Sequence, residues 1–297
     1  MKTVLFGRSG QLGWELQRTL PPLGEIQVFD YPEIDLTQPE CIRPIIQDID
    51  PELIINATAY TAVDRAESEA DLAFAINTLA PGVMAEEAVR TGAVLIHYST
   101  DYVFDGIKGS AYQENDSPNP LGVYGESKLL GERAIAASGC AHFIFRTSWV
   151  YTLRRDSFVA KVLQWSRNQT RLRLVTDQVS GPTWARMLAE ISTQAITVAL
   201  SKDEPLSWIF DRSGVYHLAG SGWASRLEWG EAILKLDPRK HEQITEEILP
   251  AVTSEFPSPA KRPLFSALDS SRFEEVFRLR IPSWKETLRL AMDTGNV

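Results

Sequence analysis

Short apolar runs alternate with segments of helical spacing through the first half of the chain. The runs predict buried parallel strands, at residues 3–7, 25–30, 52–59, 93–100 and 141–150. Between them, apolar residues recur every three or four positions and predict helices at 11–20, 40–49, 69–90 (bent at Pro81) and 124–137. This alternation implies right-handed crossovers and a parallel sheet covered on both faces. We therefore predict an α/β fold with a Rossmann-type, doubly wound parallel sheet.

The second half is less regular and predicts a smaller α/β substrate domain at the C-terminal end. Helical spacing covers 156–168, 183–200, 226–236 and 284–293, with strand-like runs at 171–176 and 215–219. Pro and Ser gather at 250–263, which predicts an extended loop or a lid. We expect residues 1–150 to form the dinucleotide-binding domain. Residues 151–297 should form mainly the substrate domain, with room for segments that return to the first.

Composition is that of an ordinary globular protein, but charge is unevenly spread. Of 297 residues, 44% are hydrophobic and 23% charged, which excludes a disordered chain. A formal net charge of −9 argues against nucleic acid and anionic membranes as partners. Residues 1–150 hold 10 basic and 21 acidic residues, whereas residues 151–297 hold 20 and 18. The second half is therefore the better candidate to receive an anionic substrate.

The cysteines and the lengths of the apolar runs indicate in which cellular compartment the protein works. Cys41 and Cys140 form neither a metal-ligand pattern nor a framework of disulfides, which favours a reducing environment. No apolar stretch approaches the roughly 20 residues of a membrane span. The N-terminal apolar run is too short for a signal peptide. We expect a cytoplasmic protein.

A glycine-rich turn follows the first predicted strand. Gly7, Gly10 and Gly13 form a G-x-x-G-x-x-G run that leads into the first helix. Glycine allows a tight turn there, and it lets a dinucleotide pyrophosphate approach the N–H groups at the helix start. The other interpretation is a packing turn without a ligand. The strand–turn–helix context favours the dinucleotide.

Two charged residues near this turn give opposite indications about the cofactor. Asp30 ends the second predicted strand, where a carboxylate can accept hydrogen bonds from the adenosine ribose and favours NAD. Arg8, inside the glycine run, could instead pair with the 2′-phosphate of NADP. Asp30 could also be a solvated strand end. NADH and NADPH both stay open.

A Tyr-x-x-x-Lys pair starts the predicted helix at 124–137. Tyr124 and Lys128 share a helix face, where the ammonium would lower the phenol pKa from about 10 and ready it for proton exchange. Ser99, Thr100 and Asp101 end the fourth predicted strand, and a hydroxyl there can bond the same substrate oxygen. Alone, the Tyr-x-x-x-Lys pair could be a solvated helix face. Together with the glycine run, these residues predict a hydride-transfer site.

Aromatic and imidazole side chains add one further candidate. Trp149 follows the fifth predicted strand at the ligand edge, where we expect it to contact the substrate. The histidines show no ligand spacing, and we expect all of them to be structural: His97, His142, His217 and His241.

The chain resembles the extended short-chain dehydrogenase/reductase superfamily and, within it, the dTDP-4-dehydrorhamnose reductase family. The resemblance runs in register over nearly the full length. Its matching stretches are LFGRSGQLGWELQ (5–17), INATAYTAVDRAE (55–67), HYSTDYVFDG (97–106), NPLGVYGESKLLGE (119–132), FRTSWVY (145–151) and, more loosely, PSPAKRP (257–263).

The resemblance implies roles for particular residues. Thr100, Tyr124 and Lys128 would be the catalytic triad. The expected cofactor contacts are with Gly10, Gln11 and Leu12 at the pyrophosphate, Asp30, Asp35 and Leu36 around the adenosine, and Ala59, Tyr60, Thr61 and Tyr98 along the groove. Thr100, Asp101 and Trp149 would face the sugar. The family is described as using NADH or NADPH.

One departure concerns Mg²⁺, which some members bind at a dimer interface. Glu15 matches the glutamate of the first helix. Arg186 stands where we would expect a carboxylate, and Glu190 follows one turn later. Because an arginine opposes a cation, we do not expect a metal-linked dimer, although a homodimer stays open.

The resemblance implies reduction of the C4 keto group of dTDP-4-dehydro-L-rhamnose, the last step of dTDP-L-rhamnose synthesis. Tyr124 would donate the proton and Thr100 would direct it. Arg262, in the PSPAKRP stretch, is our candidate to receive the substrate diphosphate. One alternative is another nucleotide-sugar reductase or epimerase. The other is a non-catalytic regulatory subunit, like the family relative that binds methionine adenosyltransferase, but an intact Tyr124 and Lys128 argue against it.

Overall fold

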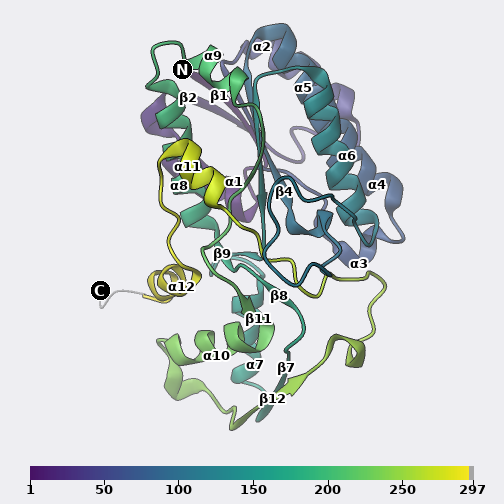
Figure 1. Ribbon diagram of the computed structural model, residues 1–297, viewed down its shortest axis with the longest axis vertical. Coiled ribbons are helices and arrows are strands. Elements are labelled where there is room, and N and C mark those ends of the chain that lie inside the picture. Colours follow the sequence, from purple (N-terminus) through teal and green to yellow (C-terminus); the bar gives the residue numbers. More distant parts are fainter. Residues whose placement is uncertain (294–297) are drawn as a thin grey trace.

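In the computed structural model, which describes residues 1–293, six parallel strands form the central sheet (Figure 1). Along the chain they are β1 (Lys2–Phe6), β2 (Glu25–Phe29), β3 (Leu53–Asn56), β4 (Val94–Thr100), β5 (His142–Thr147) and β10 (Gly214–His217). Across the sheet the order is β10-β5-β4-β3-β1-β2. The chain thus moves outward from β1 in both directions, which makes the β1/β3 boundary a switch point where such sheets bind ligands. The predicted Rossmann-type sheet is confirmed.

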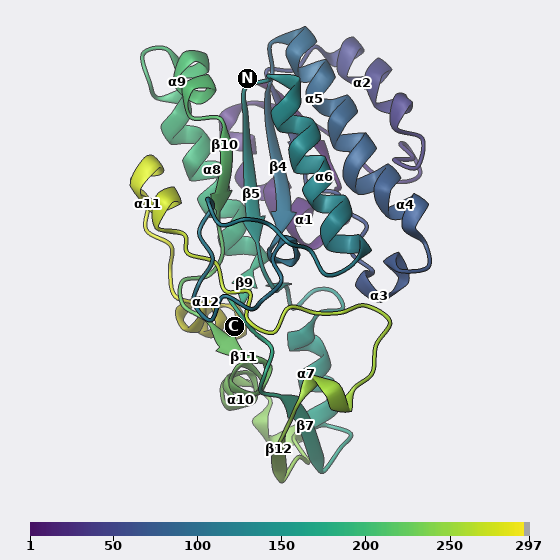
Figure 2. The ribbon, with the colours of Figure 1, turned by 45° about the vertical axis from the view of Figure 1, so that its right-hand side comes forward.

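Helices cover both faces of this sheet (Figure 2). On one face lie α1 (Gln11–Thr19), α8 (Ala185–Leu200), α9 (Pro205–Asp211) and α11 (Ser271–Phe277), and on the other α2 (Ile42–Ile49), α5 (Ala80–Thr91) and α6 (Val123–Ser138). Successive side chains of β1 point alternately to the two helical layers. Leu5 packs with α1 and α8, whereas Val4 and Phe6 pack with α2 and α5.

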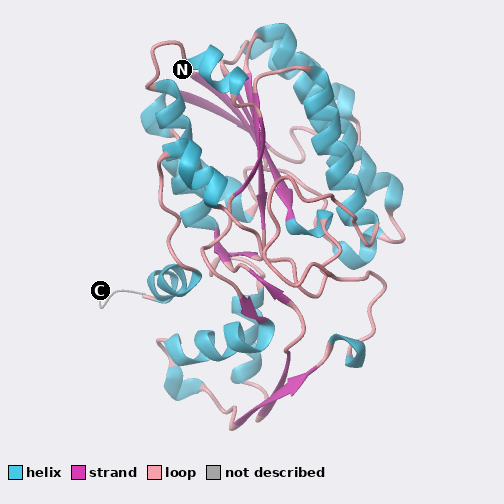
Figure 3. Ribbon diagram, viewed as in Figure 1, coloured by secondary structure: helices cyan, strands magenta, loops and turns pink. Residues whose placement is uncertain are grey.

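A smaller lobe lies beyond the carboxyl ends of the strands (Figure 3). It holds α7 (Phe158–Ser166), α10 (Arg226–Leu236) and α12 (Trp284–Met292) around a core of Tyr151, Trp229 and Leu288. Its strands form two-stranded pairs: β6 (Val150–Tyr151) with β9 (Thr183–Trp184), β7 (Arg171–Val175) with β12 (Glu247–Ala251), and β8 (Val179–Ser180) with β11 (Ala224–Ser225).

Several segments of the second half pack on the large sheet. β10 pairs in parallel with β5, so the sheet's edge strand comes from residues 214–217. Phe273 and Phe277 of α11 are fully buried against Phe143 and Phe145 of β5. The two lobes are thus built from interleaved parts of the chain.

The structure also differs from the predicted elements. Instead of one helix over 69–90, α4 (Ala70–Phe74) leads through a π-helical turn (Ala75–Leu79) into α5. Pro81 has no N–H to donate, which favours the irregular turn before it. The short helices α3 (Val63–Ala66), α9 and α11 were not predicted. No helix within residues 1–293 is long and apolar enough to cross a membrane.

Candidate active site

The loop between β1 and α1 brings bare backbone to the carboxyl edge of the sheet. Gly7 has a φ of +104°, and a Cβ there would lie 2.9 Å from the backbone of Ala57. A Cβ on Gly13 would lie 1.9 Å from the Gly7 carbonyl oxygen, so only glycine lets α1 pack this closely. At Gly10 the nearest atom to such a Cβ is 3.4 Å away. Gly7 and Gly13 therefore shape the turn, and Gly10 presents its backbone.

The start of α1 suits an anion. Gly10, its N-cap residue, supplies no side-chain cap, and the first turn holds no acidic residue. The N–H groups of a first turn have no partner within the helix, and the helix dipole adds positive potential there. Gln11 Oε1 is buried without a hydrogen-bond partner in residues 1–293, and Leu12 is buried in the core. The N–H groups at the start of α1 fit a dinucleotide pyrophosphate.

Asp30 braces the glycine loop from the end of β2. Its carboxylate accepts hydrogen bonds from the Ser9 N–H at 2.6 Å and the Tyr31 N–H at 2.9 Å. Arg8 forms an ion pair with Glu33 at 2.8 Å, and both side chains are nearly half exposed. The structure therefore gives Arg8 a carboxylate partner at the place where a 2′-phosphate would compete for it.

Thr100 and Asp101 lie at the end of β4 and are buried. Thr100 Oγ1 accepts a hydrogen bond from the Tyr102 N–H at 3.1 Å. Asp101 Oδ2 accepts from the hydroxyls of Ser180 at 2.9 Å and Ser266 at 2.5 Å. Burial raises the pKa of Asp101, and these hydroxyl groups oppose the shift. Asp101 thus ties β4 to two segments of the second half at the junction of the lobes.

Tyr124 and Lys128 lie on the first turns of α6 beside these strand ends. Burial raises the pKa of Tyr124, and a hydrogen bond with Thr100 acts against the increase. The Lys128 amine donates to the Tyr98 carbonyl oxygen at 2.7 Å and lies 3.0 Å from Nε2 of His97. Burial lowers the pKa of Lys128 to about 7.

The expectation that Lys128 lowers the pKa of Tyr124 does not hold in this structure. The phenol pKa is raised, and Lys128 is not among the groups that shift it. The physical reason is direction: the amine is drawn toward β4 by Tyr98 and His97. The spacing puts both residues on one face of α6 but does not aim the amine at the phenol.

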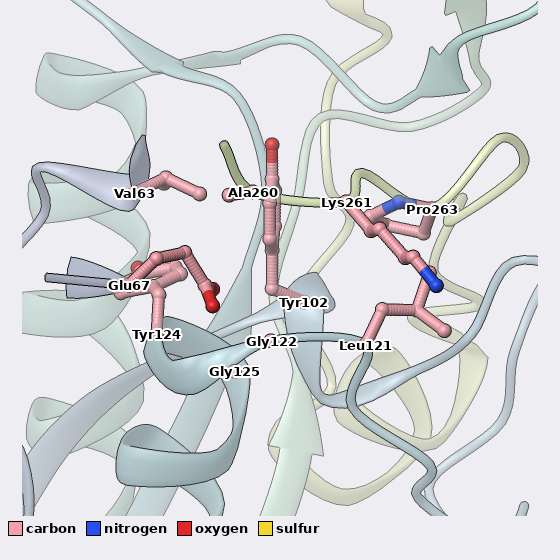
Figure 4. Close-up of a pocket in the computed structure, with 10 residues that line it drawn as sticks. All are labelled: Val63, Glu67, Tyr102, Leu121, Gly122, Tyr124, Gly125, Ala260, Lys261 and Pro263. Atoms are coloured by element: carbon pink, nitrogen blue, oxygen red, sulfur yellow. The ribbon is translucent and has the colours of Figure 1, made fainter. Parts of the chain in front are cut away.

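A small recess opens beside Tyr124, and Figure 4 shows the side chains around it. Tyr102 stands at its centre, with Glu67 on one side and Lys261 on the other. The rings of Tyr102 and Tyr124 meet edge to face with centroids 5.4 Å apart. Ala260 and Pro263 bring the 257–263 segment to the same recess. That segment therefore lies against the start of α6.

Trp149 follows β5 in a left-handed conformation, with φ of +41°. Its ring stacks on Trp229 with centroids 5.4 Å apart, and the Arg226 guanidinium lies 3.5 Å from its centroid. Burial lowers the pKa of Arg226 to about 10, and the charges of Asp101 and Tyr102 act against that decrease. Arg226 was not predicted. Its stacking on Trp149 depends on contacts across 77 residues, which local patterns do not show.

Arg262 joins the 257–263 segment to the large lobe. Its guanidinium forms an ion pair with Asp64 at 2.6 Å and bonds the Ser258 hydroxyl at 2.6 Å. Asp64 also accepts from the Ala260 N–H at 3.3 Å. Arg262 and Asp64 thus connect the two stretches 257–263 and 55–67 near the recess.

The other residues expected to contact the cofactor lie after β2, after β3 and within β4. Ala59, Tyr60 and Thr61 follow β3 at the carboxyl edge, and the Tyr60 hydroxyl bonds Glu69. Asp35 and Leu36 lie in the loop after β2. The Tyr98 ring packs on Phe145 in the core shared with α1 and α8, so its carbonyl rather than its ring reaches the site.

Glu190, the carboxylate that follows Arg186 in the segment compared with the Mg²⁺-binding members, is paired with that arginine. Arg186 forms an ion pair with Glu190 at 2.8 Å, and the charge of Glu15 also acts on Arg186. Residues 1–293 contain no cluster of three His, Cys, Asp or Glu side chains placed to hold a metal ion.

Comparison with known proteins shows the family. A family model described as the RmlD substrate binding domain matches residues 1–296. A dTDP-4-dehydrorhamnose reductase of Burkholderia thailandensis is 39% identical over 295 residues, covering 98% of each chain. The Escherichia coli protein of the same name is 39% identical, with 96% and 95% covered. This chain belongs to the dTDP-4-dehydrorhamnose reductase family.

Solved structures of the dTDP-4-dehydrorhamnose reductase family have the same fold. The Clostridium acetobutylicum protein matches with a TM-score of 0.88 and 32% identity over 99% of both chains. The Bacillus anthracis protein, in complex with NADP, matches with a TM-score of 0.88 and 31% identity over 99% of both chains. A Thermus thermophilus UDP-glucose 4-epimerase, at 20% identity and a TM-score of 0.77, shows a shared fold alone. The predicted family is confirmed, and the chain is an oxidoreductase.

Proposed function

We propose that the protein reduces the C4 keto group of dTDP-4-dehydro-L-rhamnose to dTDP-L-rhamnose with NADH or NADPH, the last step of dTDP-rhamnose biosynthesis. One observation carries the proposal. Thr100 at the end of β4 and Tyr124 and Lys128 on the first turns of α6 support it, together with the glycine turn, in a chain that spans nearly the whole of relatives named for this reaction. The Bacillus anthracis relative, which has the same fold, was solved in complex with NADP.

The cofactor would supply the hydride. Gly7, Gly10, Gln11, Leu12 and Gly13 would surround its pyrophosphate, because this turn offers bare backbone and uncapped N–H groups. Asp30 holds the loop in shape through Ser9, and its carboxylate keeps lone pairs for ribose hydroxyls. Lys128 would reach the ribose from α6.

Tyr124 would donate its phenolic proton to the carbonyl oxygen of the sugar. The raised pKa keeps this proton on the phenol before the reaction, so the residue starts as an acid. Thr100, which acts to lower the pKa of Tyr124, would share the same substrate oxygen and direct the proton. The phenolate left behind needs a nearby cation, and Lys128, one helical turn away, would provide it in its protonated form.

Residues at the lobe junction would hold the nucleotide sugar. Trp149 offers a ring face for the sugar, and Asp101 sits beside Thr100 at the end of β4. Arg262 carries a guanidinium that can exchange Asp64 for a diphosphate.

A panel of keto sugars tests the substrate assignment. Oxidation of NADH and of NADPH would be followed by absorbance with dTDP-, GDP- and UDP-linked 4-keto sugars. We expect turnover with dTDP-4-dehydrorhamnose and at most weak turnover with the GDP and UDP sugars. Preference for another nucleotide would indicate a different nucleotide-sugar reductase, and no oxidation with any sugar would support a binding subunit.

A further inference from the structure

Three buried polar residues from different elements form a chain of contacts behind the site. Asn56 ends β3, His97 lies in β4 and Lys128 lies in α6, and each is at most 1% exposed. Asn56 Nδ2 lies 3.0 Å from His97 Nδ1, and His97 Nε2 lies 3.0 Å from the Lys128 amine. His97 is therefore the middle member, with one ring nitrogen on each neighbour.

The orientation of the Asn56 amide is determined by Thr58. The Thr58 N–H donates to Asn56 Oδ1 at 3.0 Å, and the Thr58 hydroxyl bonds the same oxygen at 2.5 Å. A backbone N–H can only donate, so the oxygen must face Thr58 and the NH₂ group must face His97. His97 Nδ1 is then an acceptor. The imidazole is neutral and carries its proton on Nε2.

This tautomer has a consequence for Lys128. The Nε2–H of His97 points at the amine, and only a lone pair on that amine can accept it. An ammonium has no lone pair and would leave two donors facing each other at 3.0 Å. The amine therefore accepts from His97 and donates to the Tyr98 carbonyl oxygen at 2.7 Å.

We propose that His97, oriented by Asn56, is a positioning residue that holds Lys128 as an uncharged amine and so sets the pH at which Lys128 becomes a cation beside Tyr124. The inference rests on the proposed function, because Lys128 matters through that reaction. Burial lowers the pKa of Lys128 to about 7 and also lowers the pKa of His97, in agreement with a neutral pair.

The other charged groups near Lys128 and His97 do not determine the protonation state of Lys128. Glu132, one turn along α6, favours the ammonium, but its carboxylate is held by Arg146 of β5 at 2.6 Å and by Ser99 of β4. His142 of β5 is the other titratable group that acts on His97, and its pKa is lowered by burial. The phenol of Tyr124, one helical turn before Lys128, and the carboxylate of Asp101 at the end of β4 are not among the groups that shift the pKa of Lys128.

The first test reads the tautomer directly. In protein labelled with ¹⁵N-histidine, we expect the His97 ring to show a protonated Nε2 and an unprotonated Nδ1 across neutral pH. The signal is assigned by its loss in His97→Gln. A proton on Nδ1, or on both nitrogens, at neutral pH would overturn the proposal. Neither substrate nor cofactor is needed, so this result is independent of the proposed function.

The second test moves the titration of Lys128. The side-chain oxygen of Gln can reach the Nε2 position and accept from an ammonium, so His97→Gln should raise the Lys128 titration midpoint by about one pH unit. The midpoint is read from ¹³Cε-lysine resonances, with Lys128→Met for assignment. The alkaline limb of kcat/KM should move by the same amount. The control His142→Gln replaces a buried histidine whose Nδ1 bonds the Cys140 carbonyl, and it should leave the midpoint in place.

An unmoved Lys128 midpoint in folded His97→Gln contradicts the proposal. If that variant does not fold, the ¹⁵N measurement on the wild-type protein still decides, because the His97 signal is then assigned as the one that stays in each of His142→Gln, His217→Gln and His241→Gln. A Lys128 midpoint that moves as expected in a protein that reduces no keto sugar would instead contradict the proposed function and leave the role of His97 intact.

Discussion

Burial gives Tyr124 and Lys128 opposite shifts that suit a proton donor and a switchable cation. The phenol pKa is raised, so Tyr124 keeps its proton, and the amine pKa is lowered to about 7, so Lys128 titrates near neutral pH. Thr100 acts to lower the phenol pKa, against the effect of burial. The surroundings thus set the charge states of Tyr124 and Lys128, on which we propose that proton transfer depends.

Removing the phenolic hydroxyl should stop the reaction without loosening the cofactor. Tyr124→Phe keeps the ring and its contact with Tyr102 but has no proton to donate. We expect kcat to fall roughly 100- to 10,000-fold, with little change in NADPH affinity. Steady-state kinetics and fluorescence titration measure the two quantities. Tyr112→Phe, at a buried phenol bonded to Asp105, is the control, and near wild-type turnover of Tyr124→Phe would refute the assignment.

The ion pair of Arg262 and Asp64 allows two substitutions with opposite outcomes. Arg262→Ala should raise KM for the nucleotide sugar roughly tenfold, the effect of losing one hydrogen bond to a charged group, and leave KM for NADPH unchanged. Asp64→Asn frees the guanidinium and should not raise the sugar KM. Equal increases in both variants would show that the pair acts through the shape of the 257–263 segment.

At the residue scale, spacing alone located the candidate side chains but not their directions. Tyr124 and Lys128 were found because four residues make one helical turn. The orientation of the amine depends on Tyr98 and His97, which come from another element. The stacking of Arg226 on Trp149 likewise depends on the folded chain.

The helix α6 is fixed to the sheet by a buried ion pair. Glu132 accepts from Arg146 of β5 at 2.9 and 2.6 Å and from the Ser99 hydroxyl of β4 at 2.5 Å. Both charged side chains are 4% exposed. Because Lys128 lies one turn before Glu132, this pair determines where the start of α6 meets the strand ends.

Breaking that pair from one side should destabilise the protein. Glu132→Leu leaves the Arg146 guanidinium buried without a carboxylate, which costs about 3–5 kcal/mol in the free energy of unfolding. Urea denaturation measures the loss. The double variant Glu132→Leu/Arg146→Leu should recover part of it, since no charge stays buried. A double variant less stable than Glu132→Leu would contradict this explanation.

Substitutions at two glycines of the β1–α1 turn should have different effects, one on cofactor binding and the other on stability. At Gly13 an added Cβ meets the Gly7 carbonyl at 1.9 Å, so Gly13→Ala should lower the free energy of unfolding by at least about 1–3 kcal/mol. At Gly10 the same atom has room, so Gly10→Ala should fold normally and bind NADPH roughly tenfold more weakly. Denaturation and cofactor titration of both variants check this. Unchanged binding by Gly10→Ala would remove Gly10 from the site.

At the element scale, the strands of the large sheet and most helices followed from the pattern of apolar residues, whereas β6, β8, β9, β11 and β12 of the small lobe were not predicted. The π-helical turn at Ala75–Leu79 did not follow from this pattern either, because it depends on Pro81 and on the Asn77 side chain bonding the Tyr60 backbone. The helices α9 and α11 have seven residues each, too short for a clear helical period. Their burial comes from tertiary packing.

Across the whole molecule, the second half both completes the sheet and closes the site. β10 and α11 return to the large lobe, so the halves of the sequence are not the halves of the structure. A strand at 215–219 was predicted, but its place beside β5 required long-range pairing that sequence patterns do not specify. The more basic second half contributes Arg226 and Arg262 at the lobe junction, and we propose that Arg262 receives the substrate diphosphate there.

Transfer of label from the cofactor to the sugar tests the central claim most directly. NADPH carrying deuterium at both C4 positions of the nicotinamide would be incubated with dTDP-4-dehydrorhamnose, and the product analysed by NMR and mass spectrometry. We predict dTDP-rhamnose with a single deuterium at C4. Unchanged sugar, or product with deuterium at another carbon or none, would contradict the proposed reduction at C4.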